Sequence, residues 1–189
     1  MTASTNAFVL AERCLCATDP ESKLAWTHEA AERARSGQLD FTPRDVSLPI
    51  QAVRFPERPL WVAPRELLRR AIYTPQGRVA LLHAVAHIEF TAIQLARDHL
   101  YRFRGLPEEY YRDWLTVAAE EAEHFALVRD RLRELGVDYG ELPVHGGLWG
   151  IARETAYDVA ARMALVPRCL ESPGIGRDAG NDRKAPPSR

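Results

Sequence analysis

The stretch AAEEAEHFALVRDRL, residues 118–132, carries Glu121 and His124 on the apolar face of a predicted helix. Residues three apart on a helix point the same way, so this carboxylate and this imidazole can hold one ion together. Ionisable groups on a buried face are costly unless something pairs with them. The Glu-x-x-His pattern therefore indicates either two metal ligands or an acid and a histidine that satisfy each other by hydrogen bonds.

A third ionisable group, Glu89, interrupts a second apolar stripe. Its neighbours at helical offsets are all apolar: Leu82, Val85, Ala86, Ala92, Ile93 and Ala96. The chain between Glu89 and Glu121 has room for one long helix, a turn and a climb back to the same level. One Glu from one helix and Glu-x-x-His from the next are half of the ligand set of a di-iron or di-manganese carboxylate bundle. Carboxylates bridge hard cations, and imidazole adds a nitrogen ligand.

Two further histidines, His83 and His87, are spaced as a metal pair on one helix face. The same face carries Thr91, Gln94 and Asp98, which favours polar packing or a supporting role over ligation. The sequence holds no Gly-rich phosphate loop, no nucleophile elbow and no Cys-x-x-Cys pair, so we expect no nucleotide cofactor.

Glu154, Asp158 and Arg162 are expected on one stripe of a later helix. Such an acid–base ladder is usually structural, and Glu154 stays open as a candidate ligand. His145 is expected to be a structural loop residue, and the basic cluster of Arg65, Arg69 and Arg70 a solvated face.

Helical periodicity dominates the sequence, and strand signals are nearly absent, which predicts an all-α fold. A short helix is expected at 4–17, and a second begins after Asp19 with Pro20 at its first position and ends before Gly37. Residues 38–64 contain repeated prolines and are predicted to wrap irregularly against the core.

A short helix is expected to start at Pro64. Three long helical patterns follow, at 77–103, 108–135 and 148–171. The short connection between the first two makes them antiparallel neighbours.

Composition narrows the class of protein. The chain has 189 residues, 46% of them hydrophobic, and a net charge of -1, so it is globular with no global basic surface for nucleic acid. Its three cysteines suit a reducing, cytoplasmic compartment. We expect no leader peptide and no membrane span.

Four stretches carry a family resemblance: RFPERPLWVAPRE, GRVALLHAVAHIEFTAIQLARDHLYRF, DWLTVAAEEAEHFALVRDRLRELGVDYGELPVHGGLW and TAYDVAARMALVPRCLE. Over roughly residues 10–171 the chain resembles domain of unknown function 455, a bacterial family placed in the ferritin-like superfamily. The resemblance implies a metal-binding helical bundle with no settled reaction. It also implies that Glu89, Glu121 and His124 are ligands, and that Glu171, which matches the glutamate of the family's E-A-R-G-L-D motif, is a ligand from the third long helix.

The resemblance stops at ESPG, residues 171–174, so the fourth long helix of the bundle is expected to be missing. We interpret residues 172–189 as a disordered, out-of-frame tail. With permitted codons, a shift of one nucleotide turns GIGRDAGNDRKAP into GLDVTPGMIEKL, which is similar to the family sequence after E-A-R. The alternative is a natural truncation with an unrelated end. Either way, we expect this chain to be marginally stable and its metal site to be impaired.

These observations divide the chain into N-terminal helices with a Pro-rich wrap (1–64), an incomplete ferritin-like core (65–171) and the tail (172–189). The leading hypothesis is a di-iron or di-manganese oxidase or hydroxylase with an unknown small-molecule or RNA substrate. The RNA alternative rests on analogy with the tRNA-hydroxylase branch of ferritin-like proteins. The competing hypothesis is a non-catalytic helical interaction protein without a working metal site. Both hypotheses are compatible with a homo-oligomer.

Overall fold

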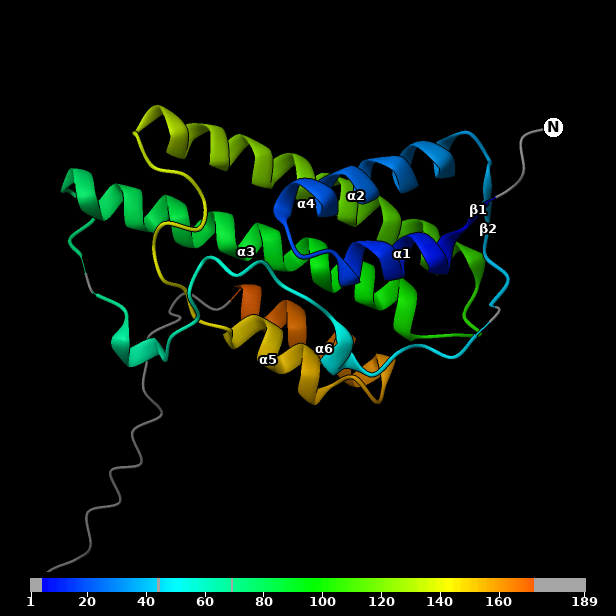
Figure 1. Cartoon of the computed structure of the whole chain (residues 1–189). Helices are drawn as coiled ribbons and strands as arrows, with labels where there is room; N and C mark the ends of the chain where they lie inside the picture. Colours follow the sequence, from blue (N-terminus) through cyan, green and yellow to red (C-terminus); the bar gives the residue numbers. More distant parts are fainter. Residues whose placement is uncertain (1–4, 44, 69, 172–189) are drawn as a thin grey trace, which may run out of the picture.

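The computed structural model describes residues 5–43, 45–68 and 70–171, so the tail at 172–189 lies outside the described residues. The described chain is mostly helical (Figure 1). Its elements in order are β1 (Thr5–Asn6), α1 (Ala7–Cys16), α2 (Pro20–Arg35), β2 (Leu39–Asp40), the 3-10 turns η1 (Ile50–Ala52) and η2 (Pro64–Glu66), α3 (Pro75–Arg102), α4 (Glu108–Glu134), α5 (Gly147–Glu154) and α6 (Val159–Glu171).

The first two helices begin at side chains that cap them. Asn6 accepts hydrogen bonds from the amides of Phe8 and Val9 at the start of α1, and Asp19 accepts one from Ser22 at 2.7 Å at the start of α2. Beyond the end of α2, Gly37 adopts φ +67°, a conformation that favours glycine. The expected second helix is therefore confirmed, and the first is shorter than expected by a few residues.

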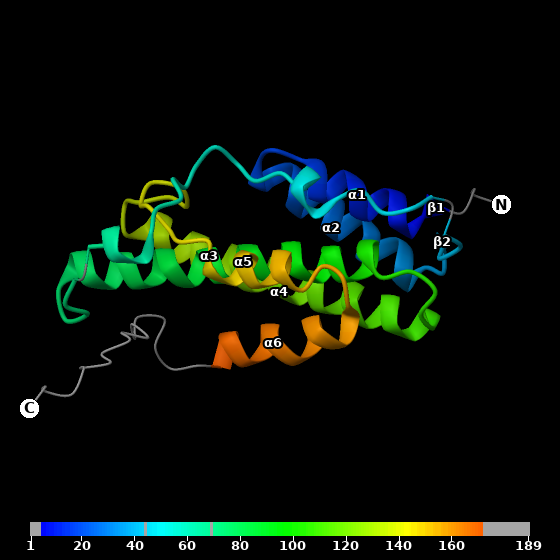
Figure 2. The ribbon, with the colours of Figure 1, turned by 90° about the horizontal axis from the view of Figure 1, so that it is seen from below.

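Helices α3 and α4 form the centre of the molecule. They lie side by side and antiparallel, as expected, with α1 and α2 against one side of the pair (Figure 2). One buried apolar cluster joins α1, α2 and these two helices, and includes Leu10, Leu100 and Leu115. A second lies farther along the pair and includes Phe90 and Phe125.

Helix α3 is the one described helix with the length and apolar composition to cross a membrane, and 56% of its most apolar window is buried inside the protein. It packs against α1, α4 and α5. A buried core helix passes the same test, and α3 has the surroundings of one.

A small sheet corrects the all-α expectation. Strands β1 and β2 pair in parallel, with Thr5 opposite Leu39 and Asn6 opposite Asp40. Strands of two residues carry no periodic pattern, so no sequence signal marks them.

The third long helix expected at 148–171 is broken into α5 and α6. The Thr155 hydroxyl donates to the Ile151 carbonyl at 2.7 Å, at the end of α5. Asp158 accepts a hydrogen bond from the Ala161 amide at 2.7 Å and so caps the start of α6. The expected stripe of Glu154, Asp158 and Arg162 does not exist, because its members lie on two helices and the turn between them.

The prediction of a short helix that starts at Pro64 is also wrong, since only the turn η2 forms there. The Glu66 carboxylate accepts a hydrogen bond from the Ala63 amide at 2.8 Å and closes this turn. Beyond it, Leu68, Ile72 and Tyr73 are exposed. A short amphipathic helix needs a packing surface for its apolar face, and these side chains have none among the described residues.

Residues 38–64 wrap against the core, as expected. The Arg54 amide donates to the Leu15 carbonyl at 2.9 Å, and the Gln94 side chain of α3 donates to the Arg54 carbonyl at 3.1 Å. Phe55 packs edge-on against both Trp61 and Trp149. The segment therefore links α1, α3 and α5.

Helix α6 lies on the side of the α3–α4 pair away from α1 and α2, and runs in the direction of α4 (Figure 2). Residues 135–158, which include α5, form the long crossover that makes this parallel arrangement. A fully buried ion pair of 2.9 Å between Asp98 and Arg162 joins α6 to α3.

Candidate metal centre

The structure brings Glu89 of α3 together with Glu121 and His124 of α4. One ligand atom from each of the three side chains lies within 4.8 Å of the other two. The antiparallel packing of α3 and α4 places these side chains at the same height along the helix pair. Phe90, next to Glu89, and Phe125, next to His124, contact each other in the core, with ring centroids 5.3 Å apart. Within the described ranges this is the single group of three potential ligands that lie so close together.

The cluster is more open than the sequence suggested. The Glu121 side chain is 23% exposed and the His124 side chain 56%. The expected buried face of α4 is wrong by one position, because the fully buried residues beside Glu121 and His124 are Ala118, Ala122 and Phe125. Glu121 and His124 border that stripe, so the cluster lies at a partly open edge of the α3–α4 pair.

The electrostatics of the cluster follow from two carboxyl groups in contact. Burial raises the pKa of Glu89 to about 7, with further contributions from its hydrogen bond to Glu121 and the negative charge of that group. The hydrogen bond from His124 Nδ1 to Glu121 Oε2, 3.1 Å long, raises the pKa of the imidazole. Near neutral pH the cluster therefore holds protons that a divalent cation could displace on binding.

His83 and His87 take no part in this cluster, because their ring nitrogens have other partners. His83 Nε2 accepts a hydrogen bond from the Gly140 amide at 3.0 Å. His87 Nδ1 lies 3.0 Å from the Tyr139 hydroxyl. Burial lowers the pKa of each histidine to about 4, so both are neutral. These contacts confirm polar packing.

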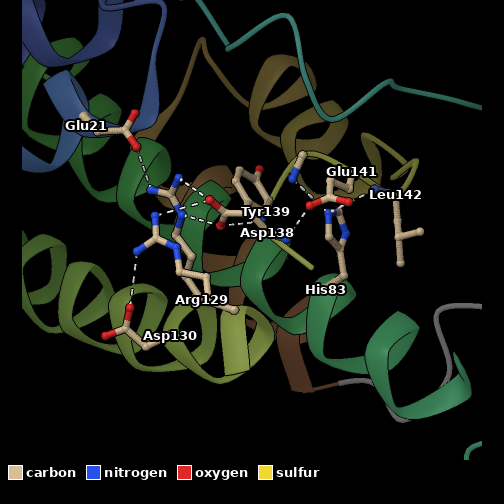
Figure 3. A network of polar contacts seen from close by, with 10 residues as sticks. Glu21, His83, Arg129, Asp130, Asp138, Tyr139, Glu141 and Leu142 are labelled. Atoms are coloured by element: carbon tan, nitrogen blue, oxygen red, sulfur yellow. Dashed lines mark hydrogen bonds and ion pairs between the residues drawn. The ribbon is translucent and has the colours of Figure 1, made fainter. Parts of the chain in front are cut away.

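The sequence predicted the loop between α4 and α5, but gave no sign of the contacts that Tyr139 and its neighbours make there. Figure 3 shows this loop between Arg129 of α4 and His83 of α3. Arg129 grips both oxygens of Asp138, at 2.7 and 3.0 Å, and also binds Glu21 of α2. Burial alone would raise the pKa of Asp138, but the guanidinium and a backbone amide lower it to about 2. The pattern VDYGELP does not reveal these partners, which lie on α3 and α4, while Glu21 of α2 reaches the loop only through Arg129.

Among the described residues, no other candidate from the sequence belongs to the cluster. Glu154 is exposed at the end of α5, and Arg65 and Arg70 are exposed, as expected. His145 is a loop residue whose Nδ1 accepts a hydrogen bond of 3.2 Å from the Gly147 amide. Helix α6 ends at Glu171, whose side chain lies outside the described part of the chain, so its role stays a prediction.

Comparisons with known proteins place the sequence among relatives. A family model described as "Protein of unknown function (DUF455)" matches residues 16–181. An uncharacterized protein of Haemophilus influenzae is 49% identical over 128 residues, which cover 64% of this chain and 44% of the relative. The chain thus spans less than half the length of that relative. No solved structure matches the chain significantly.

Proposed function

We propose that this chain, which belongs to the DUF455 family of proteins of unknown function, binds a divalent transition metal through Glu89, Glu121 and His124. The observation that carries the proposal is the convergence of these three side chains from two helices to within 4.8 Å. The proposal extends to a ferritin-like di-metal carboxylate centre, in which Glu171 would be a further ligand.

The donor set suits iron or manganese. Two carboxylates offset the charge of a divalent ion, and one imidazole adds a borderline ligand, a mixture that hard and borderline metals accept. Three protein ligands suffice for one ion and leave positions free. The second ion of a di-metal centre needs ligands beyond these three.

The course of the chain supports the ferritin-like assignment. Ferritin-like bundles have one long crossover, which makes two consecutive bundle helices parallel. Helices α4 and α6 are parallel and are joined by residues 135–158 (Figures 1 and 2). The metal ligands lie on the preceding antiparallel pair, the place where such a bundle carries the first half of its site.

The reaction class that fits such a centre is an oxidase or hydroxylase. A bound di-iron or di-manganese pair would supply dioxygen activation. The residues of the chain would hold the metal, and Glu121 would orient the His124 ring through their hydrogen bond. The matched region covers 44% of the relative, and the substrate is left unnamed in this proposal.

One observation favours the competing function, a non-catalytic helical protein. Glu121 and His124 pair with each other through a hydrogen bond of 3.1 Å, and the Glu89 carboxyl lies beside them within 4.8 Å. A cluster of this kind could persist as a polar patch at a binding surface.

Metal analysis of the purified full chain separates the two. Because the site has only part of its expected ligand set, we expect weak but saturable binding of Mn²⁺ or anaerobic Fe²⁺ in equilibrium dialysis, and loss of most of it in Glu121→Gln and in His124→Ala. Glu123→Gln, which removes the same charge from an exposed neighbour on α4, should keep the metal. His83→Gln should keep it too, because the hydrogen bonds of His83 lie outside the cluster.

Circular dichroism would establish that each variant is folded. A folded wild-type chain that binds no metal, or an equal loss in Glu123→Gln and Glu121→Gln, would refute the assignment of the site.

A further inference from the structure

We propose a second binding site, for a small planar aromatic anion, in the cavity between the wrapping segment and α5. The cavity has a volume of about 410 Å³ and is lined by six residues of the wrapping segment on one side and by Trp149 and Arg153 of α5 on the other. The six are Ile50, Gln51, Val53, Phe55, Pro56 and Trp61. Small-molecule sites span roughly 300–1,000 Å³ and combine apolar walls with a few polar groups. This cavity has both features.

Three aromatic rings form the apolar wall. Phe55 lies edge-on between Trp61, at 4.8 Å between centroids and 71°, and Trp149, at 5.2 Å and 68°. An array of edges and faces of this kind accepts a flat ring by stacking or edge contact.

Trp61 is held rigidly although it is exposed. Val144 pairs with the backbone on both sides of it, through Val62 N to Val144 O at 2.8 Å and Val144 N to Leu60 O at 2.9 Å. The indole lies so close to Gly146 that an added Cβ there would be 2.4 Å from the ring. Even so, 40% of Trp61 is exposed. A large ring fixed in place beside a cavity offers contact area without the entropy cost of ordering it on binding.

The charge at the cavity selects an anion. Arg153 lines it and is exposed, and its guanidinium has no hydrogen bond or ion pair with any residue in the described part of the chain. The remaining polar side chain of the lining is Gln51, and no acidic side chain lines the cavity. A guanidinium beside aromatic walls favours a carboxylate, sulfonate or phosphate on the ring and opposes a cation.

The cavity is separate from the proposed metal centre. Its aromatic wall contacts α3 through His87, at 5.8 Å from the Trp61 ring, and through Phe90, at 6.5 Å from Phe55. Glu89 is two residues from His87 and therefore points about 200° around the helix from it. The site stands whether or not the cluster binds metal.

Tryptophan indole signals in an NMR titration of the full chain with naphthalene-1-sulfonate test the site directly. The chain has four tryptophans, of which Trp61 and Trp149 lie at the cavity, while Trp26 and Trp114 pack in the N-terminal core. We expect saturable shifts for the first two indoles and none for the others. The neutral analogue naphthalene-1-methanol should bind about tenfold more weakly, and 1-naphthylmethylammonium more weakly still.

Arg153→Gln should weaken sulfonate binding about tenfold, whereas Arg65→Gln, another exposed arginine that does not line the cavity, should leave it unchanged. The proposal is overturned by the absence of a saturable shift, by equal shifts at all four tryptophans, or by an Arg153→Gln variant that binds as tightly as the wild type.

Discussion

The buried ion pair that joins α6 to α3 predicts an asymmetric response to mutation. Asp98 and Arg162 are both fully buried and lie 2.9 Å apart. Asp98 also accepts hydrogen bonds from Arg102, at 2.6–3.0 Å. One carboxylate therefore serves two guanidinium groups, and the two ends of the network are not equivalent.

Asp98→Asn leaves two positive groups facing a neutral amide, one of them fully buried. Removing one partner of a buried ion pair costs roughly 3–5 kcal/mol. In Arg162→Met, the Asp98 carboxylate keeps its ion pair with Arg102, and the Thr155 hydroxyl keeps its hydrogen bond to the Ile151 carbonyl. The remaining loss is that of a few hydrogen bonds, roughly 1–3 kcal/mol of unfolding free energy. Asp98→Asn should therefore be the more damaging change.

Urea unfolding followed by circular dichroism measures both variants and the double variant. We expect the double variant to be more stable than the sum of the two single losses predicts, because Met removes the charge that Asn leaves unpaired. If Arg162→Met costs as much as Asp98→Asn, Arg102 does not compensate Asp98. If the two losses simply add, Asp98 and Arg162 are not coupled. Either result would refute the proposed asymmetry of the network.

Three further changes test other parts of the structure. The buried ammonium of Lys23 donates to the Cys14 carbonyl at the end of α1, and burial lowers its pKa to about 8. The unfolded chain holds that proton to higher pH, so the free energy of unfolding should rise between about pH 8 and about pH 10, by up to about 3 kcal/mol. Urea unfolding measures this as a rise in midpoint, which Lys23→Met should remove. Because burial lowers the pKa of His87 to about 4, stability should fall as pH drops from about 6.5 to 4, and His87→Gln should make that fall shallower in the same assay. Gly146→Ala should displace Trp61, cost roughly 1–3 kcal/mol in urea unfolding, and shift the Trp61 indole signal; an unchanged signal would contradict the close packing at Gly146.

Local signals predicted the elements whose ends are set by neighbouring residues. Asp19 and Pro20 begin α2 and Gly37 follows its end, as the sequence indicated. The bounds of α3 and α4 were predicted to within two residues because prolines and glycines lie at their ends. Such features act within one turn of the chain, so a single sequence contains them.

The break between α5 and α6 depends on both local and distant contacts. Asp158 is a good cap, but it is equally acceptable on the surface of a continuous helix. What favours the break is Arg162, which reaches back to Thr155 at 2.7 Å and across to Asp98 on α3. The partner on α3 is far away in the sequence, and no periodicity reveals it.

The position of the candidate metal cluster was predictable, whereas its exposure was not. Glu89 and Glu121 were expected at one level, and the structure places them there. On α4 the assumed apolar face was one position off, and so His124 was expected inside the protein but is exposed. One residue corresponds to about 100° of rotation, which is enough to move a side chain from the core to its edge.

Helix α3 shows why periodicity could not fix the ligand face. It has neighbours on several sides, with α1, α4 and α5 all packed against it. From Phe90 to Tyr101 every residue of α3 is buried, so the apolar residues that follow Glu89 do not distinguish the core from an edge. The distinguishing contact is the ring pair of Phe90 and Phe125, which sets how α3 and α4 face each other. For such a central helix, the direction of an ionisable side chain follows from its partner helices, and the candidate ligands on α3 can be identified only together with those on α4.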